Sequence, residues 1–280
     1  MKKTIILAVI LFQAALLLAV FDDYNPSARA RGMGGAYTGV ADDVNAIFYN
    51  PAGLTNVNME AMIGFSQLNN QEFTEFKTAA VGIRLPQNLG TVALGARLFD
   101  VDFEEETLMS EQIWSLSHAF SLQKDIHSQI SVGYTVNYNL LQFDDDVHDE
   151  AFAVDLGATA LLHGRTKFGF CVTNLRQAVM GNNNQNTLPS KLSLGVSYLP
   201  YDQVTTSIEV RKDFGQETEF MGGVEAKMLE ILSLRFGVHH NPATWNAGVG
   251  LDVEGIKIDF SYSTHTVLPG TIYGNVGYKF

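Results

Sequence analysis

The sequence offers few combinations of side chains that could catalyse a reaction or bind a metal ion. His239 and His240 are neighbours, and imidazole is a common metal ligand, but adjacent residues of a strand point to opposite faces and cannot chelate one ion. The single cysteine, Cys171, excludes a disulfide framework and a thiolate zinc site. The glycines at 32–35 lack the preceding strand and the lysine of a nucleotide loop. We therefore expect no catalytic residues, no metal site, no cofactor and no enzymatic activity.

Two acidic runs could bind divalent cations through their carboxylate oxygens. They comprise Asp100, Asp102, Glu104, Glu105 and Glu106, and then Asp144, Asp145, Asp146 and Asp149. A solvated, charged rim would explain both runs. Cation bridging to anionic lipopolysaccharide is the alternative.

Composition and the start of the chain narrow the class of protein. Of 280 residues, 46% are hydrophobic and 17% charged, which excludes a disordered chain. A net charge of −12 argues against a nucleic-acid partner. Residues 1–20 combine a basic start with an apolar run from Thr4 to Val20, the pattern of a secretory signal peptide. An uncleaved anchor helix is the alternative, and either one predicts export from the cytoplasm.

The rest of the chain alternates between apolar and polar residues. Residues 130–140 show this most clearly, with Val132, Tyr134 and Val136 on one parity and Ser131, Gly133 and Thr135 on the other. Period-2 alternation predicts strands with one apolar and one polar face. The segments with this pattern are 60–66, 74–85, 91–98, 112–122, 130–140, 151–162, 166–175, 192–198, 204–212, 219–228, 232–239, 244–253, 256–263 and 271–280.

The connections between these segments favour a membrane barrel over a soluble sandwich. Short turns at 86–90, 123–128, 163–165, 199–203, 229–231 and 254–255 mostly alternate with longer loops predicted at 100–110, 142–149, 176–188 and 213–218. Such alternation is typical of an up-and-down barrel in a bacterial outer membrane. The terminal Tyr278-Lys279-Phe280 resembles the assembly signal of such proteins. We expect residues 60–280 to form a closed antiparallel transmembrane β-barrel of about 14 strands, with the apolar parity facing lipid and the polar parity facing the lumen.

Six charged residues within these segments share the polar, inward parity. They are Arg97, Arg235, Lys257, Asp259, Glu209 and Arg211. Facing lipid would cost each basic residue about 2–4 kcal/mol near the membrane midplane, so we expect them to face the lumen. Ion pairs that position an inner segment are one role for them. Arg97 and Arg235 could instead hold the carboxylate of a ligand.

Residues 21–59 do not alternate, and we expect them to fold into the lumen as a partly helical plug. Asp42 is the predicted N-cap of a short helix, and Pro51 is predicted to end it. Gly53 could supply a left-handed turn. Gly32, Gly34 and Gly35 would allow close approach to the inner wall. A disordered periplasmic leader is the alternative.

This N-terminal stretch resembles a known signature. The matching residues are Ser27 to Ala36 and Ala41 to Leu54, including Arg31, Gly32, Gly34, Gly35, Asp42, Asp43, Asn50, Pro51 and Gly53. They look like the signature of the FadL superfamily of outer-membrane barrels, most like its PorV/PorQ-type members. The resemblance implies a fourteen-stranded barrel with an N-terminal plug. FadL-type members pass long-chain fatty acids and other hydrophobic molecules, with a lateral opening in the wall, and PorV-type members serve type IX protein secretion.

We therefore predict an outer-membrane barrel that passes hydrophobic small molecules, with membrane lipid and a hydrophobic ligand as its partners. A PorV/PorQ-like component that binds secretion-system proteins is the first alternative. A secreted soluble β-protein is the second.

Overall fold

The computed structural model describes residues 26–103, 106–143, 147–180, 186–214 and 216–280. The predicted signal peptide, residues 1–20, lies outside this range. Three short helical elements come first: α2 (Ala28–Gly32), α3 (Ala46–Tyr49) and the 3₁₀ helix η1 (Pro51–Asn56). Another 3₁₀ turn, η2 (Leu68–Asn70), follows the first strand. Among the described residues, no helix is long and apolar enough to cross a membrane.

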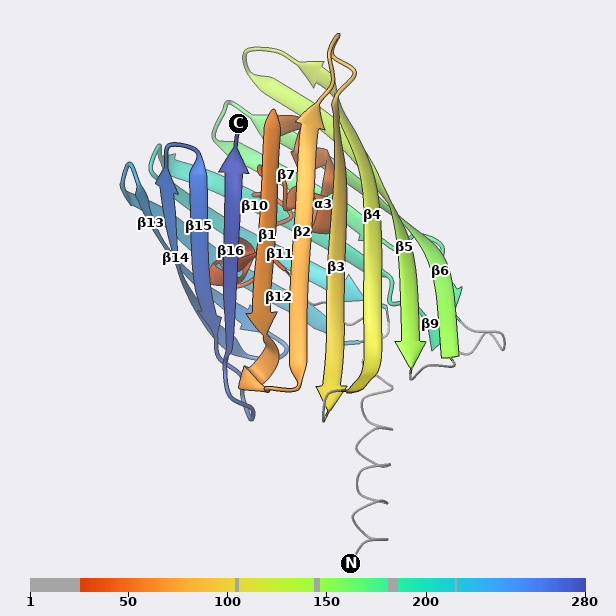
Figure 1. Cartoon of the computed structure of the whole chain (residues 1–280). Helices are drawn as coiled ribbons and strands as arrows, with labels where there is room; N and C mark the ends of the chain where they lie inside the picture. Colours follow the sequence, from red (N-terminus) through yellow and green to blue (C-terminus); the bar gives the residue numbers. More distant parts are fainter. Residues whose placement is uncertain (1–25, 104–105, 144–146, 181–185, 215) are drawn as a thin grey trace, which may run out of the picture.

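Fourteen strands close into one antiparallel barrel (Figure 1). They are β1 (Met59–Gln67), β2 (Thr74–Arg84), β3 (Thr91–Phe103), β4 (Glu106–Lys124), β5 (Ser128–Phe143), β6 (Val147–Leu162), β7 (Thr166–Thr173), β10 (Lys191–Tyr201), β11 (Val204–Asp213), β12 (Thr218–Leu229), β13 (Leu232–His240), β14 (Thr244–Val253), β15 (Ile256–Ser263) and β16 (Thr271–Lys279). They follow chain order around the wall, and β1 closes on β16 from Glu60↔Lys279 to Gln67↔Ile272. The predicted barrel and its strand number are confirmed, and each alternating segment falls on one wall strand.

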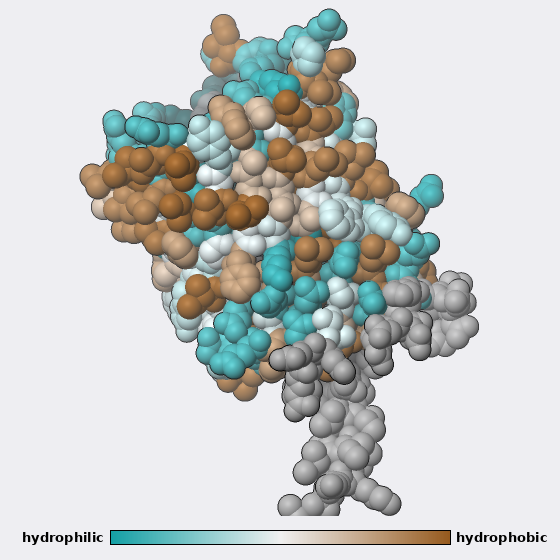
Figure 2. Space-filling model, viewed as in Figure 1, coloured by the Kyte–Doolittle hydropathy of each residue, from teal (hydrophilic) through white to brown (hydrophobic). Residues whose placement is uncertain are grey.

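The apolar parity faces outward and the polar parity faces inward. On β4 the side chain of Leu116 is 55% exposed, whereas that of its neighbour Ser117 is 1% exposed. Tyr134 and Thr135 on β5 show the same contrast, with 43% and 0%. Figure 2 shows hydrophobic residues over much of the middle of one outer face, with hydrophilic residues gathered toward the ends. A soluble body would turn its apolar residues inward, so the soluble alternative is not the structure observed.

The two ends of the barrel differ in their connections. One end, the turn rim, carries 85–90, 125–127, 163–165, 202–203, 230–231 and 254–255, together with the end of the chain, where the Phe280 amide bonds to the Met59 carbonyl. The other end, the loop rim, carries the described residues 68–73, 174–180, 186–190, 214, 216–217, 241–243 and 264–270. A small two-stranded antiparallel sheet, β8 (Val179–Met180) with β9 (Asn186–Thr187), lies on this rim and was not predicted.

The long loops predicted at 100–110 and 142–149 are wrong for the described residues. β3 continues to Phe103 and β5 to Phe143, and ladder pairs such as Asp100↔Ser110 and Leu141↔Asp149 extend toward the loop rim. Polar residues, Asp100 and Asp102 on β3 and Gln142 on β5, take the outward parity there and remove the apolar half of the alternation. Backbone pairing does not depend on that pattern once a strand leaves the apolar band, so the strands continue where the sequence signal stops.

Candidate functional site in the barrel lumen

Residues 26–57 pack against the inner wall of the barrel, and glycines make the approach possible. An added Cβ at Gly133 on β5 would lie 2.6 Å from the carbonyl carbon of Pro51. One at Gly237 on β13 would lie 2.7 Å from the Cα of Gly34. The wall glycines that meet the backbone of residues 32–52 in this way are Gly133, Gly169, Gly195, Gly223, Gly237 and Gly248, and Gly95 and Gly157 meet its side chains. We call them the glycine belt, and only glycine lets two backbones approach so closely.

The glycines predicted to allow close approach behave accordingly. Gly34 and Gly35 have φ of 69° and 85°, and a Cβ at Gly34 would lie 2.6 Å from the Val238 carbonyl oxygen. A Cβ at Gly32 would lie 3.2 Å from the Cα of Gly248. Gly53 differs from its prediction, because it lies within η1 and has no left-handed φ. Its Cβ would lie 2.9 Å from the carbonyl carbon of Ala41, so close packing requires glycine there.

The short helix after Asp43 is capped differently from the prediction. Asp42 is not the N-cap; its carboxylate pairs with Arg29, and Asn45 holds the N-cap position of α3. The Asp43 carboxylate instead accepts the backbone N–H of Asn45 at 2.9 Å. The predicted end of the helix is confirmed, since α3 stops at Tyr49 and Asn50 is extended.

Asn50 and Pro51 join this segment to the wall. The fully buried Asn50 donates from Nδ2 to the carbonyls of Thr38, at 3.0 Å, and Ala158 of β6, at 3.2 Å. Its Oδ1 accepts the Ala52 N–H at 3.2 Å, and Pro51 occupies the first turn of η1, where no donor is needed. These bonds satisfy an amide that would otherwise be costly to bury.

Two wall side chains bind backbone groups of the same segment. Glu209 on β11 accepts the N–H groups of Tyr37 and Thr38 at 2.9 and 2.8 Å. Lys167 on β7 donates to the carbonyls of Val40 and Ala41 at 3.0 and 2.6 Å. The segment therefore receives wall contacts through charged side chains as well as through glycine backbones.

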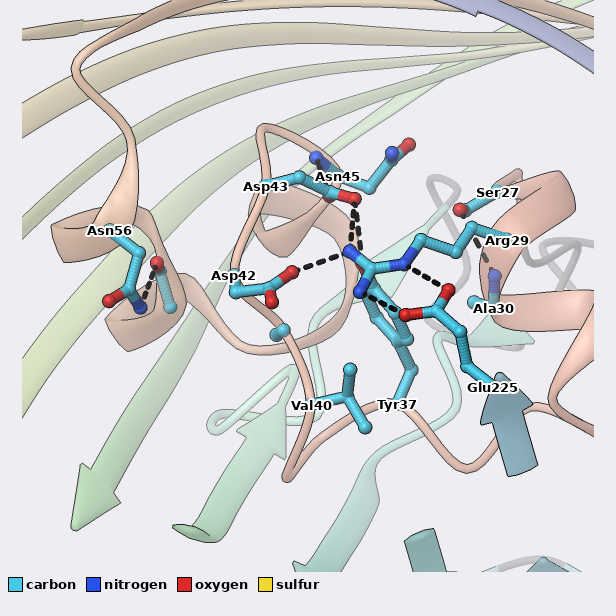
Figure 3. A network of polar contacts seen from close by, with 12 residues as sticks. Ser27, Arg29, Ala30, Tyr37, Val40, Asp42, Asp43, Asn45, Asn56 and Glu225 are labelled. Atoms are coloured by element: carbon cyan, nitrogen blue, oxygen red, sulfur yellow. Dashed lines mark hydrogen bonds and ion pairs between the residues drawn. The ribbon is translucent and has the colours of Figure 1, made fainter. Parts of the chain in front are cut away.

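A network of ion pairs connects the segment to β12, β13 and β15, and Figure 3 shows the part of it around Arg29 and Glu225. Arg29 on α2 binds both Glu225 oxygens, Nε at 2.9 Å and Nη2 at 2.8 Å, and its Nη1 lies 2.5 Å from Asp42 and 3.1 Å from Asp43. Glu225 also accepts Nε of Arg235 at 2.6 Å. Nη1 of Arg235 lies 2.6 Å from Asp259.

The charges of the segment stabilise one another. Burial opposes the charge of Arg29, but the carboxylates of Asp42 and Glu225 raise the pKa of its guanidinium well above the ordinary value. Burial alone would raise the pKa of Asp43, yet Arg29 and Lys257 hold it below its ordinary value. Burial raises the pKa of Tyr37, whose hydroxyl donates to Asp43 at 2.7 Å. Arg29 and Asp43 are therefore both charged near neutral pH.

The predicted lumen charges divide into two groups. Arg235, Lys257 and Asp259 lie in ion pairs, with Nζ of Lys257 3.0 Å from Glu60. Arg97 lies elsewhere, its guanidinium 5.3 Å from the centre of the Phe48 ring. Arg31, from the signature, stacks at 5.2 Å over the Tyr273 ring. The sequence did not identify Arg29 or Glu225 as site residues, although a carboxylate on an inward parity requires a nearby cation.

Toward the loop rim the inner wall becomes apolar. Leu141, Ala151 and Ala153 form one buried cluster with Met180 and Leu188, and Met109, Ile113 and Phe143 pack against it. A second cluster joins Leu68, Phe76 and Phe99, with Val101 and Met109 packed against it. Met109 packs against both clusters, so together they form one continuous group of inward-facing apolar side chains, most of them buried against one another. We call this the inward apolar surface.

Among the described residues, no group of three or more histidine, cysteine or acidic side chains is placed to hold a metal ion. Glu104, Glu105, Asp144, Asp145 and Asp146 of the acidic runs lie outside the described residues. His239 lies beside Glu219 inside the barrel, and His240 beside the outward ring of Phe220. Cys171 is buried on the inward side of β7.

Comparison with solved structures relates the fold to known barrels. A Pseudomonas aeruginosa FadL homologue superposes with a TM-score of 0.59 at 10% identity, covering 91% of this chain and 98% of that one. The P. putida toluene transporter TodX gives 0.60 at 12% identity with the same coverage. The Acinetobacter baumannii outer-membrane protein Omp33 gives 0.50 at 9%, covering 80% and 98%. No protein-family model and no curated protein matches the sequence. These similarities show a shared barrel fold.

Proposed function

We propose that this chain is an outer-membrane transport barrel rather than an enzyme, and that it passes hydrophobic small molecules. The observation that carries the proposal is the inward apolar surface at the loop rim. A lumen that conducted only water and ions would have no use for Phe76, Phe99 and Leu141 on its inner wall. Apolar burial supplies affinity for an apolar ligand. The similarity to a FadL homologue and to a toluene transporter supports the same function.

In this proposal residues 26–57 act as the plug of the barrel. They fill the middle of the lumen between the inward apolar surface and the turn rim, and their contacts with the glycine belt leave little room beside them. A fourteen-stranded wall is too wide for its own side chains to close. Passage of a ligand through the barrel therefore requires the segment to shift, and the ligand first binds on the loop-rim side of the segment.

Arg97 is our candidate anchor for a fatty-acid-like ligand. It lies two residues from Phe99 on the inward side of β3 and opposite Ile113 of β4 in register, at the inner end of the apolar surface. A carboxylate at that position would meet a guanidinium while its chain lay on the apolar side chains. Arg235 is a weaker candidate because it lies on β13, which contributes no residue to the inward apolar surface. The PorV/PorQ-type alternative rests on the N-terminal signature alone.

Uptake measurements test the function. A strain lacking this gene, complemented with the wild type, should take up a radiolabelled long-chain fatty acid or toluene several-fold faster than the uncomplemented strain. Phe99→Ser combined with Leu141→Ser should abolish that gain, whereas Ser117→Ala, a small inward change below the apolar surface, should retain it. Arg97→Gln should slow uptake of the fatty acid and leave toluene unaffected. Equal uptake with and without the gene would refute the function.

A further inference from the structure

The segment inside the lumen is held by two different kinds of contact. Near β5, β6 and β7, its backbone lies directly against glycines of the belt, such as Gly133 and Gly169. Near β12, β13 and β15, an ion-pair network adds to the glycine contacts. Backbone packing against glycine holds the segment on both sides of the lumen and is fixed by the shape of the wall. Ion pairs between side chains can exchange partners, so the pairs made by α2 are the contacts that can part while the wall keeps its shape.

Arg29 is the residue through which that network crosses from segment to wall. One edge of its guanidinium, Nε and Nη2, binds Glu225 of β12, and Nη1 binds Asp42 and Asp43 of the segment itself. The planar fork of arginine makes this double engagement possible, and a lysine ammonium could not reproduce it. In Figure 3 the guanidinium lies between the carboxylates of segment and wall.

Separation at Arg29 leaves both sides internally paired. Glu225 keeps Arg235, which also pairs with Asp259, so the wall retains its own charge partners. Arg29 keeps Asp42 and Asp43, so the segment retains its own. Burying an unpaired charge is what usually makes a buried ion pair hard to break. This arrangement avoids that cost.

The network also borders a cavity of about 240 Å³ toward the turn rim. Arg29, Asp43, Glu225 and Arg235 line it on the inside, and the exposed Lys227, Asp252 and Lys279 line its rim side. Ions and water from the turn-rim side therefore have space next to the pairs that hold the segment, and a displaced α2 has space to enter.

We propose that Arg29 and Glu225 form a latch that holds the N-terminal segment across the lumen, and that parting them opens the barrel from the turn-rim side. This inference rests on the proposed function in treating the segment as a plug. It goes further in naming the contact that controls it. Ion conductance measures opening of the barrel without any hydrophobic ligand, so the latch proposal can fail or succeed independently of the uptake result.

The test measures conductance of the full chain in planar lipid bilayers in potassium chloride. Arg29→Gln and Glu225→Gln should each raise the mean conductance several-fold over the wild type, and the double variant should add little to either. Arg165→Gln removes an exposed pair with Asp202 on the turn rim, 3.7 Å apart, and should match the wild type. If Arg29→Gln does not fold, Glu225→Gln tests the same contact, because this variant retains the ion pair of Arg235 with Asp259. Wild-type conductance in both latch variants would overturn the proposal.

Discussion

Replacing Gly169 with alanine tests whether the glycine belt holds the inner segment in place. A Cβ at Gly169 would lie 2.5 Å from the carbonyl carbon of Thr38 and would overlap its oxygen. The obstructing atoms are backbone, so no side chain can rotate away. Overpacking of this kind costs about 1–3 kcal/mol. If Thr38 moves instead, its N–H leaves Glu209, a bond to a charged group worth about 1.5–3 kcal/mol, so either route predicts a loss of at least about 1 kcal/mol.

Urea unfolding in detergent, followed by the mobility shift of folded barrels on gels, measures the loss. Protease cleavage within residues 26–57 reports whether the segment has left the wall. Gly222→Ala is the matched control, because Gly222 faces outward on β12 and the nearest atoms to its added Cβ are 3.8 Å away. If Gly169→Ala unfolded at the same urea concentration as Gly222→Ala and resisted protease equally, the segment would not be packed against β7 as described.

Two further predictions concern charge. The pKa of Asp43 in the folded protein lies below its unfolded value, which is near 3.9. Its contribution to stability is therefore complete above the unfolded pKa and is lost as the pH falls through the folded pKa. The thermal unfolding midpoint of the wild type should decrease from pH 6 to pH 2.5, and the decrease should be smaller in Asp43→Asn. Leu116→Arg places a cation on the lipid-facing side of β4 and should reduce the free energy of unfolding in vesicles by about 2–4 kcal/mol, measured by denaturant titration. The control is Ser117→Arg, which places the same side chain on the inward face. Its cost is steric and should not depend on the thickness of the bilayer. Equal losses for the two arginines in thick and thin bilayers would contradict the assignment of faces.

The wall could be predicted from the sequence because its signal is local. In residues 130–140 each residue reports its own face, and the same holds for every strand within the apolar band. The signal failed toward the loop rim, where the outward parity becomes polar and the inward parity becomes apolar, so the continuation of β3 past Asp100 and of β5 past Leu141 was assigned to loops. It also failed for β8 and β9, whose two-residue strands are too short for any period to appear.

The contacts of the inner segment lay beyond sequence reasoning for a different reason. Arg29 and Glu225 are separated by 196 positions, and no local pattern joins them. Asp42 and Asp43 are adjacent and chemically alike, so the choice of which one bonds the backbone near α3 depends on where Arg29 lies. Gly53 illustrates the same limit: its sequence context suggests a turn, but the neighbour that requires glycine is Ala41 of the folded segment.

The inner wall divides by chemistry along the barrel axis, and this division connects the contacts to the proposed function. Glycines, charged side chains and a few small or apolar side chains such as Ala80 contact the inner segment, whereas the large aromatic residues of the inward apolar surface lie beyond it, toward the loop rim. An apolar molecule gains free energy on the loop-rim side of the segment and none beside the charges of Arg29 and Glu225 on the other. The segment therefore stands at the boundary between a surface that retains such a molecule and a charged cavity that repels it. A hydrophobic ligand should accumulate against the segment and leave only when the segment moves.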